Sequence, residues 1–303
     1  MNKFLKQTFD YAVYAISLVF TLVPESFFEQ YKLFEKLSTE TNTIINRLIA
    51  FAAVMALIAV VHAIFLCLRW SVRIKGKNYS IKVSYGDIFK QKNAKIVIPF
   101  DECFTTAVGT APDEIKPTSI CGQYLLKHPI GSMAPLLEKA KLKPIDSKSQ
   151  YNNQERYDAG RLVPRDNFLL MSFAKLDKDG LGRMTRDEYI DCLSVLWSEI
   201  DKYYGQTDVC ISVLGSGITR LDDTSLSQQE LLDMIIKSYQ LSAHKIKKPA
   251  QLHIVCRRSD DFSLNRIGEY VRARLIPLRT QIGIHLVAAN PNLGIRRCFH
   301  ISK

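Results

Sequence analysis

The stretch DKDGLGRMTRDE combines acidic residues and glycines at the spacing of a metal site. Four of its residues match positions one, three, six and twelve of an EF-hand calcium loop: Asp177, Asp179, Gly182 and Glu188. Such a loop holds calcium through carboxylate and carbonyl oxygens. Position five is Leu181, which offers no side-chain oxygen. The loop is also single, whereas EF-hands normally occur in pairs.

The same stretch also fits an ordinary turn that leads into a helix. Asp and Gly favour turns, and the preceding residues 168–176 fit a strand as well as an entering helix. Thr185, with Glu188 three residues later, has the pattern of a capping box. This interpretation explains the spacing without a metal. We therefore predict no metal site and keep calcium binding as an alternative.

A glycine-rich turn follows a strand pattern in the segment VLGSGITRL, residues 213–221. Two glycines around a small residue allow successive backbone N–H groups to face an anion. Thr219 adds a hydroxyl group, and the planar guanidinium of Arg220 suits a phosphate. No GK[ST] follows, so the turn is not a P-loop, and an ordinary strand-to-helix turn is the alternative. We predict an anion site composed of Gly215, Ser216, Gly217, Ile218, Thr219 and Arg220.

Three further segments place acidic or small residues near strand ends. Asp87 and Ile88 follow Gly86, one short loop before the apolar run KIVIPF. The end of that run carries an acidic pair within Pro99, Phe100, Asp101 and Glu102. A small-residue turn leads into a helix pattern and contains Ser119, Ile120, Cys121, Gly122 and Gln123. Because open α/β sheets bind ligands at the carboxyl ends of their strands, we predict that these segments surround one site.

The elements that must position these residues alternate between strand and helix patterns. Short β-branched runs predict a hairpin at 72–86 and buried strands at 95–100, 209–215 and 251–256. Apolar residues at helical spacing predict helices at 187–204, 225–240 and 263–275. The polar, Lys-rich stretch 134–165 is predicted to be a long loop. This alternation predicts an α/β domain with helices on both faces of a sheet.

Two apolar segments near the N-terminus predict a transmembrane helical hairpin. Residues 48–68 lack formal charge over a length that crosses a hydrocarbon core of about 30 Å. Residues 11–23 are fewer and end at Pro24; a signal peptide is the alternative, but no small-residue cleavage site follows. His62 lies within the second segment, where a helix–helix contact is the simpler role and an intramembrane functional role the alternative.

From these segments we predict two domains. The first, 1–68, contains spans at about 9–24 and 45–68, and the second, 69–303, is a large soluble domain. The strongest positive run follows the second span, which places both ends of the hairpin and the soluble domain in the cytoplasm. The lipid bilayer is therefore a predicted partner.

Composition excludes several other classes. The chain has 303 residues and a formal charge of +11, but its basic residues are dispersed and no recognition motif appears, so we predict no nucleic-acid partner. Its seven cysteines have no framework spacing, which fits a reducing cytosol. No nucleophile–base pair is evident. We therefore predict no catalytic residues, no cofactor and a binding protein rather than an enzyme.

The combination of Gly86-Asp87-Ile88, the strand Ile96-Val97-Ile98 and a later strand that ends in Gly-X-Gly resembles the macro-domain family. The resemblance implies a macro-domain-like three-layer α/β/α sandwich that binds ADP-ribose. Asp87 and Ile88 would hold the adenine. The turns at 119–123 and 215–220 would cradle the diphosphate.

The two N-terminal spans, together with IPFDE, TSICG and LGSGITRL, resemble a narrower group over nearly the whole chain. This group comprises the transmembrane macro-domain effectors of type II Thoeris antiphage defence. It implies a bacterial inner-membrane protein that senses an ADP-ribose-derived signal, such as histidine-linked ADP-ribose, which a partner TIR-domain enzyme makes from NAD. The effector would then form a homo-oligomer and disrupt the membrane, which causes abortive infection.

One departure from the macro-domain pattern concerns catalysis. Hydrolytic members carry an Asn-rich turn where this chain has Pro99-Phe100-Asp101-Glu102. The change favours a reader of the nucleotide, with the acidic pair placed to meet an amine-bearing substituent. The alternative is a membrane-bound ADP-ribosyl hydrolase that would use Asp101 or Glu102 as a base.

Overall fold

The structure is a computed structural model that divides into two compact units, Met1–Arg69 and Trp70–Lys303. It describes residues 3–30, 38–111, 114–217, 220–221, 226–260 and 262–267. The predicted site residues Ile218 and Thr219 lie outside these ranges, as does most of the helix predicted at 263–275.

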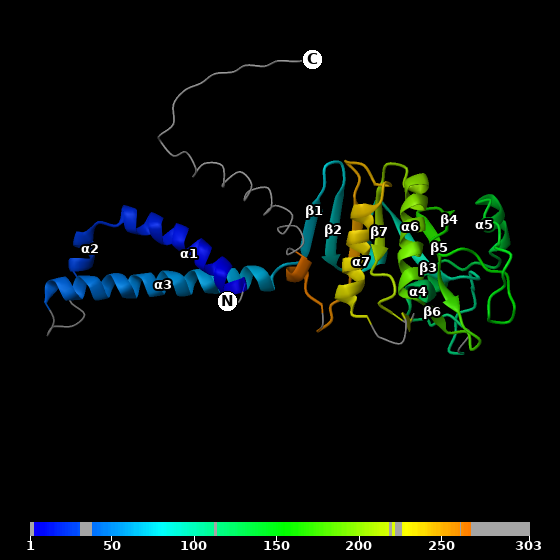
Figure 1. Ribbon diagram of the computed structural model, residues 1–303, viewed down its shortest axis with the longest axis horizontal. Coiled ribbons are helices and arrows are strands. Elements are labelled where there is room, and N and C mark those ends of the chain that lie inside the picture. Colours follow the sequence, from blue (N-terminus) through cyan, green and yellow to red (C-terminus); the bar gives the residue numbers. More distant parts are fainter. Residues whose placement is uncertain are drawn as a thin grey trace, which may run out of the picture. The chain divides into compact units, whose positions relative to one another are not determined.

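The N-terminal unit consists of helices α1 (Lys3–Leu22), α2 (Glu25–Glu29) and α3 (Thr39–Cys67), with α1 and α2 packed against α3 (Figure 1). Helix α3 begins before the apolar run because Ser38 caps it by accepting the Thr41 N–H. Within the described ranges, α3 is the one helix with the length and composition of a membrane span. The predicted first span forms α1, which includes Lys6 and Asp10, so a two-span hairpin stays a prediction.

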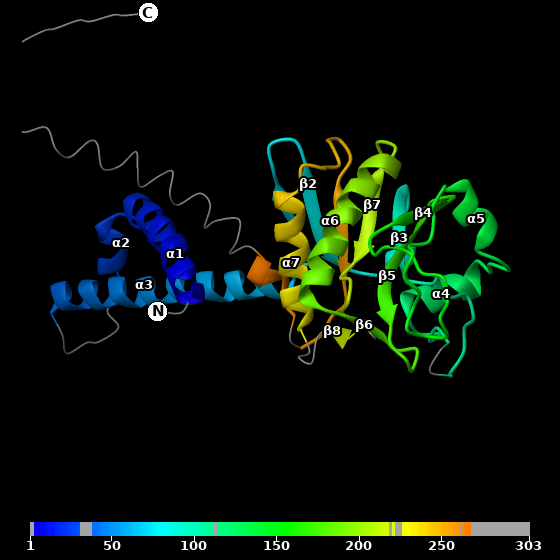
Figure 2. The same ribbon diagram turned by 45° about the vertical axis from the view of Figure 1, so that its right-hand side comes forward.

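The described residues of the C-terminal unit form a nine-stranded mixed sheet (Figures 1 and 2). In spatial order, its strands are β1 (Ser71–Lys75), β2 (Ser80–Tyr85), β9 (Leu252–Cys256), β7 (Asp208–Ser212), β3 (Ala94–Asp101), β5 (Phe168–Leu176), β6 (Gly182–Met184) and β8 (Arg220–Leu221), with β4 (Leu162–Arg165) also paired to β5. The five strands from β2 to β5 run parallel, so their carboxyl ends share one edge.

Helices cover both faces of this sheet. Helices α6 (Arg186–Tyr203) and α7 (Gln228–Leu241) pack on one face, and α4 (Ile120–Lys127) with the short 3-10 helix η1 (Ile88–Lys90) packs on the other. Strand β3 serves both cores because successive side chains alternate: Val97 joins the first core, whereas Ile96 and Ile98 join the second. The predicted three-layer α/β architecture is confirmed.

Helix starts that depend on a few neighbouring residues are close to the predictions. The Thr185–Glu188 capping box starts α6 as predicted. Helix α7 starts three residues later than expected, behind a second capping box formed by Ser227 and Glu230. The long-loop prediction for 134–165 is wrong in part, because α5 (Ala134–Lys139) and β4 lie within it.

Candidate functional site

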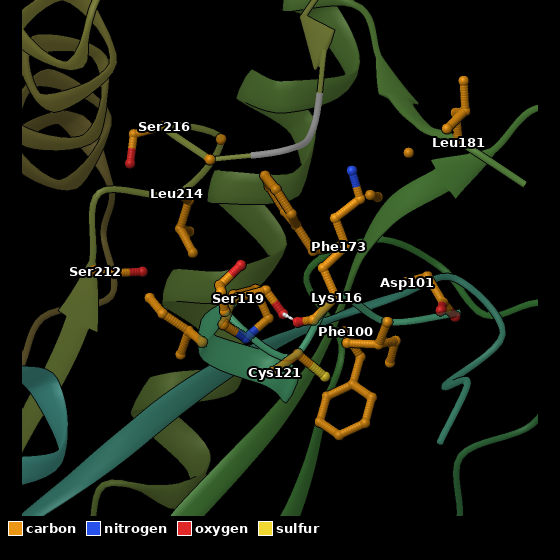
Figure 3. A pocket seen from close by; sticks show the side chains of 18 of the residues that line it. Phe100, Asp101, Lys116, Ser119, Cys121, Phe173, Leu181, Ser212, Leu214 and Ser216 are labelled. Carbon is orange, nitrogen blue, oxygen red and sulfur yellow. Dashed lines mark hydrogen bonds between the residues drawn. The ribbon is translucent and has the colours of Figure 1, made fainter. Parts of the chain in front are cut away.

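A cavity of about 250 Å³ opens at the carboxyl edge of the parallel strands (Figure 3). The ends of β3, β5 and β7, the start of α4 and the turn between β5 and β6 form its walls. Its apolar lining consists mainly of Phe100, Ile115, Ile120, Phe173, Leu176, Leu181, Val213 and Leu214. Ligand sites of small molecules combine such an apolar wall with a few convergent polar groups.

The first polar group is the glycine turn after β7. The Tyr189 hydroxyl of α6 donates to the Leu214 carbonyl at 3.0 Å, and burial raises the pKa of Tyr189 well above its ordinary value, so it remains a donor. The backbone N–H and the hydroxyl of Ser216 both donate to the Val213 carbonyl. Gly215 has a φ of +78°, a left-handed conformation that favours glycine. These contacts hold the turn against the cavity.

The second polar group is the N-terminus of α4. The Ser119 hydroxyl accepts the Gly122 N–H at 2.9 Å, and the Ser119 carbonyl accepts the Gln123 N–H. The N–H groups of Ile120 and Cys121 have no acceptor among the described residues, as expected of a first helical turn. They are therefore available to an anion at the positive end of the helix dipole.

Gly122 allows this turn to pack closely. A Cβ atom at Gly122 would lie 2.2 Å from the carbonyl oxygen of Lys116, which is a backbone atom. That same carbonyl accepts both the N–H and the hydroxyl of Ser119. A larger residue at position 122 would therefore displace the 116–119 turn and with it the first turn of α4.

Three ionisable side chains of the cavity, those of Lys116, Asp101 and Cys121, differ in exposure. The exposed Lys116 lines the cavity with its side chain beside Phe173 (Figure 3), and its ammonium group suits an anion. Burial raises the pKa of Asp101, while N–H groups of Thr105 and Cys103 oppose the shift by donating to its carboxylate. Burial also raises the pKa of Cys121 well above its ordinary value, so its sulfur is a thiol and not a nucleophilic thiolate.

The structure brings nine of the predicted site residues into this one cavity. They are Pro99, Phe100, Asp101, Ser119, Ile120, Cys121, Gly215, Ser216 and Gly217. Gly122 lies beneath the helix start, and Gln123 donates to the Thr118 carbonyl at 3.0 Å instead of lining the cavity. Arg220 is placed only as a backbone position in β8. Ligand binding by these residues remains a prediction.

Glu102 departs from the prediction that it would share the site with Asp101. Its buried carboxylate accepts the Ser149 hydroxyl at 2.6 Å, the Leu176 N–H at 3.1 Å and the Arg156 guanidinium at 3.2 Å. It borders a separate, charged hollow of about 510 Å³. The pairing of β3 with β5 shifts by one residue between Phe100 and Asp101, and β3 ends at Asp101, so Glu102 lies in the turn that follows the strand.

Asp87 and Ile88 also lie outside the cavity lining. The Asp87 carboxylate caps η1 by accepting the Phe89 N–H at 2.9 Å, and Ile88 is buried in the second core. Both residues follow β2, which is separated from β7 by β9. An adenine site there would extend the cavity along the same sheet edge, and it remains a prediction.

The stretch that resembled a calcium loop has other partners. Both Asp177 oxygens are engaged, one with the N–H groups of Asp179 and Leu181 and the other with Arg183. Glu188 binds Lys175 and the Thr185 N–H. No cluster of potential metal ligands occurs among the residues that the structure describes. Turn and capping-box chemistry therefore account for the acidic spacing.

Sequence reasoning missed several residues that line the cavity: Lys116, Phe173, Ser212, Gly180, Leu181 and Gly182. Ser212 and Phe173 lie at or near strand ends, which is the available signal. The turn Gly180–Gly182 follows β5, so recognition of 168–176 as a parallel strand would have placed it at the ligand edge.

Comparisons with known proteins are consistent with this geometry. The family described as "Thoeris protein ThsA, Macro domain" matches residues 81–257. The Thoeris protein ThsA of Bacillus amyloliquefaciens (strain Y2) is 26% identical over 227 residues, which cover 72% of this chain and 76% of that protein.

Two solved structures have lower sequence identity to this chain than the Bacillus protein has. A mutant of the Oceanobacillus iheyensis macrodomain is 13% identical with a TM-score of 0.42 and covers 69% of this chain and 99% of its own. The macrodomain of Thermus aquaticus DarG is 11% identical with a TM-score of 0.36 and covers 59% of this chain and 98% of its own. The family match extends over the strands and turns that build the cavity.

Proposed function

The chain belongs to the Thoeris ThsA macro-domain family, and on this premise we propose that its cavity binds an ADP-ribose-derived signal molecule. One observation supports this most strongly: the glycine turn after β7 and the N-terminus of α4 line the same cavity. The N–H groups of Ile120 and Cys121 at the helix N-terminus suit one phosphate of a diphosphate. In the glycine turn the Ser216 N–H donates to the Val213 carbonyl, so Gly215 and Gly217 are the residues of that turn left to contact the second phosphate. Lys116 supplies a complementary positive charge.

The protein acts as a sensor and effector in antiphage defence. A TIR-domain enzyme that consumes NAD supplies the signal, and a histidine-linked ADP-ribose is the ligand class that the resemblance favours. Binding stabilises an assembly-competent state of the C-terminal unit by its differential affinity for that state. Homo-oligomers then bring several apolar α3 helices together in the inner membrane, which loses its integrity.

A hydrolase is the second candidate, and Asp101 is the observation that favours it. Asp101 lines the cavity, and burial raises the pKa of its carboxyl group, one oxygen of which accepts the N–H groups of Cys103 and Thr105. Glu102 is a poor second base because Ser149, Arg156 and Leu176 occupy its oxygens. Incubation of the full chain with ADP-ribosylated substrate distinguishes the two functions: a sensor releases no product over hours.

The test of binding compares two glycine-to-alanine variants of the full chain in detergent micelles. Titration calorimetry with ADP-ribose should show at least a tenfold loss of affinity, about 1.4 kcal/mol, for Gly122→Ala. Gly131→Ala is the matched control, because a Cβ atom there has no neighbour within 4 Å. Equal affinity of wild type and Gly122→Ala, with unchanged melting temperatures, would refute the proposal.

A further inference from the structure

The turn that joins β5 to β6 forms the end wall of the cavity. Gly180, Leu181 and Gly182 all line it, together with Leu176 at the end of β5. Figure 3 shows Leu181 on the side of Asp101, across the cavity from Ser216. This wall lies outside the two turns that we assign to the diphosphate.

The wall is preformed by hydrogen bonds within the turn. The N–H groups of Asp179 and Leu181 donate to one Asp177 carboxylate oxygen at 3.0 and 2.9 Å, and Arg183 binds the other oxygen. The Asp177 N–H donates to the Leu181 carbonyl, and the Gly180 N–H donates to the Asp177 carbonyl, both at 3.0 Å. Gly180 has a φ of +77°, which suits glycine. The turn therefore presents a fixed shape to the cavity.

Strand β6 also connects this wall to the glycine turn after β7. It pairs in parallel with β8, with Arg183 opposite Arg220 and Met184 opposite Leu221. Strand β8 follows closely on the glycine turn along the chain, and the Tyr189 hydroxyl holds the other side of that turn at Leu214. The end wall and the glycine turn thus belong to one hydrogen-bonded rim.

The order of strands indicates which part of a ligand meets this wall. Strand β7 precedes the glycine turn, β3 lies next to it, and β5 lies beyond β3. Asp87 follows β2, on the opposite side of β7. A nucleotide whose diphosphate lies at the β7–β3 crevice, with its base toward β2, must direct its other end toward β5 and the β5–β6 turn.

We propose that the Asp177–Gly182 turn is the specificity wall of the cavity and reads the group attached beyond the diphosphate. Leu181 and Leu176 offer hydrocarbon to one face of that group, such as the carbon face of a sugar. The ligand class is a nucleoside diphosphate that carries a further group on its terminal phosphate. This inference rests on the proposed function, because it requires the diphosphate to lie at the glycine turn.

The test compares ADP, which ends at the diphosphate, with ADP-ribose, which continues beyond it. Titration calorimetry on the full chain in lipid nanodiscs should show that Leu181→Ala weakens ADP-ribose about fivefold to tenfold and leaves ADP within about twofold. Leu181→Trp, which fills the end of the cavity, should do the same by obstruction. Asp177→Ala, which frees the turn without altering a lining side chain, should reproduce the selective loss.

Leu241→Ala is the matched control, since Leu241 is 81% exposed on α7, outside the cavity lining. It should change neither affinity. Equal losses of ADP and ADP-ribose affinity in the turn variants, or no loss in any of them, would overturn the inference while the proposed function stands. A wild-type chain that binds neither nucleotide would instead overturn the proposed function, and this inference with it.

Discussion

Helix α3 and the sheet core of the C-terminal unit bury different kinds of side chain. Helix α3 buries only polar residues: Asn42, Thr43, Asn46 and His62. Its large apolar side chains point outward and include Leu48, Leu57, Val60 and Phe65. In the C-terminal unit, β9 is buried along its whole length, and helix α6 places Leu193, Leu196 and Trp197 in the core.

This difference is the one expected if α3 lies in lipid and the C-terminal unit lies in water. In water, apolar side chains must leave the surface, and the C-terminal unit obeys that rule. In lipid there is no such drive, and polar groups are instead buried where they find partners within the protein. The exposed apolar side chains of residues 48–68, with the polar His62 buried between them, therefore support the proposal that α3 lies in a bilayer, which its length and composition alone permit.

The largest expected effect comes from comparing the same type of substitution, leucine to alanine, in each of the two units. Leu196 is fully buried and Leu57 is 63% exposed. Leu196→Ala should lower the free energy of unfolding of the C-terminal unit by about 2–5 kcal/mol, because it opens a cavity in a packed core. Leu57→Ala should leave it unchanged. Denaturant unfolding, followed by fluorescence of the buried Trp197, measures both. A similar cost for Leu57→Ala would mean that α3 packs in a protein core.

A second comparison uses the buried histidine–hydroxyl pair of the C-terminal unit. His253 Nε2 lies 2.7 Å from Ser84 Oγ, between the parallel strands β9 and β2. Burial first, and the charge of Lys82 second, lower the pKa of His253 from 6.5 to about 4. Between pH 6.5 and about 4, His253 therefore stays neutral in the folded state but is protonated in the unfolded state.

The sign of the pH dependence follows from that lowered pKa. The contribution of His253 is fully present above pH 6.5 and is lost as the pH falls toward about 4. The loss is at most about 3 kcal/mol. Chemical denaturation of the full chain at pH 7 and 4.5 should show a smaller difference for His253→Gln than for wild type. An equal difference would show that His253 is not the group that titrates.

The sequence predicts those features that one segment determines by itself. The β-branched runs at 95–100 and 251–256 form β3 and β9, and the small-residue turn before α4 carries its capping serine. The positions of side chains that depend on how strands pair are predicted less well. Asp101 and Glu102 are adjacent in sequence, yet beside a shift of register Asp101 lines the cavity and the Glu102 carboxylate binds Arg156.

Residues 177–188, which resemble a calcium loop, give a second example of what local sequence does not predict. Their composition correctly indicates a turn and a capping box. Their place at the cavity depends on the parallel pairing of β5 with β3, whose residues are about seventy positions apart in sequence, and no local spacing encodes that pairing. For the same reason, Lys116 became visible as a cavity residue only in the folded chain.

The smallest expected effect concerns the matching histidine–hydroxyl pair of the N-terminal unit. Thr8 Oγ1 lies 2.9 Å from His62 Nδ1, across the contact between α1 and α3. Hydrogen bonds between helices in lipid average about 0.6 kcal/mol, so Thr8→Val should speed amide hydrogen exchange in α1 about threefold in nanodiscs. Thr21→Val is the matched control, because Thr21 donates only within α1, to the Ser17 carbonyl. An effect of several kcal/mol would instead place this pair in a folded core surrounded by water, where an unpaired buried histidine costs more, and would remove the distinction between the two units.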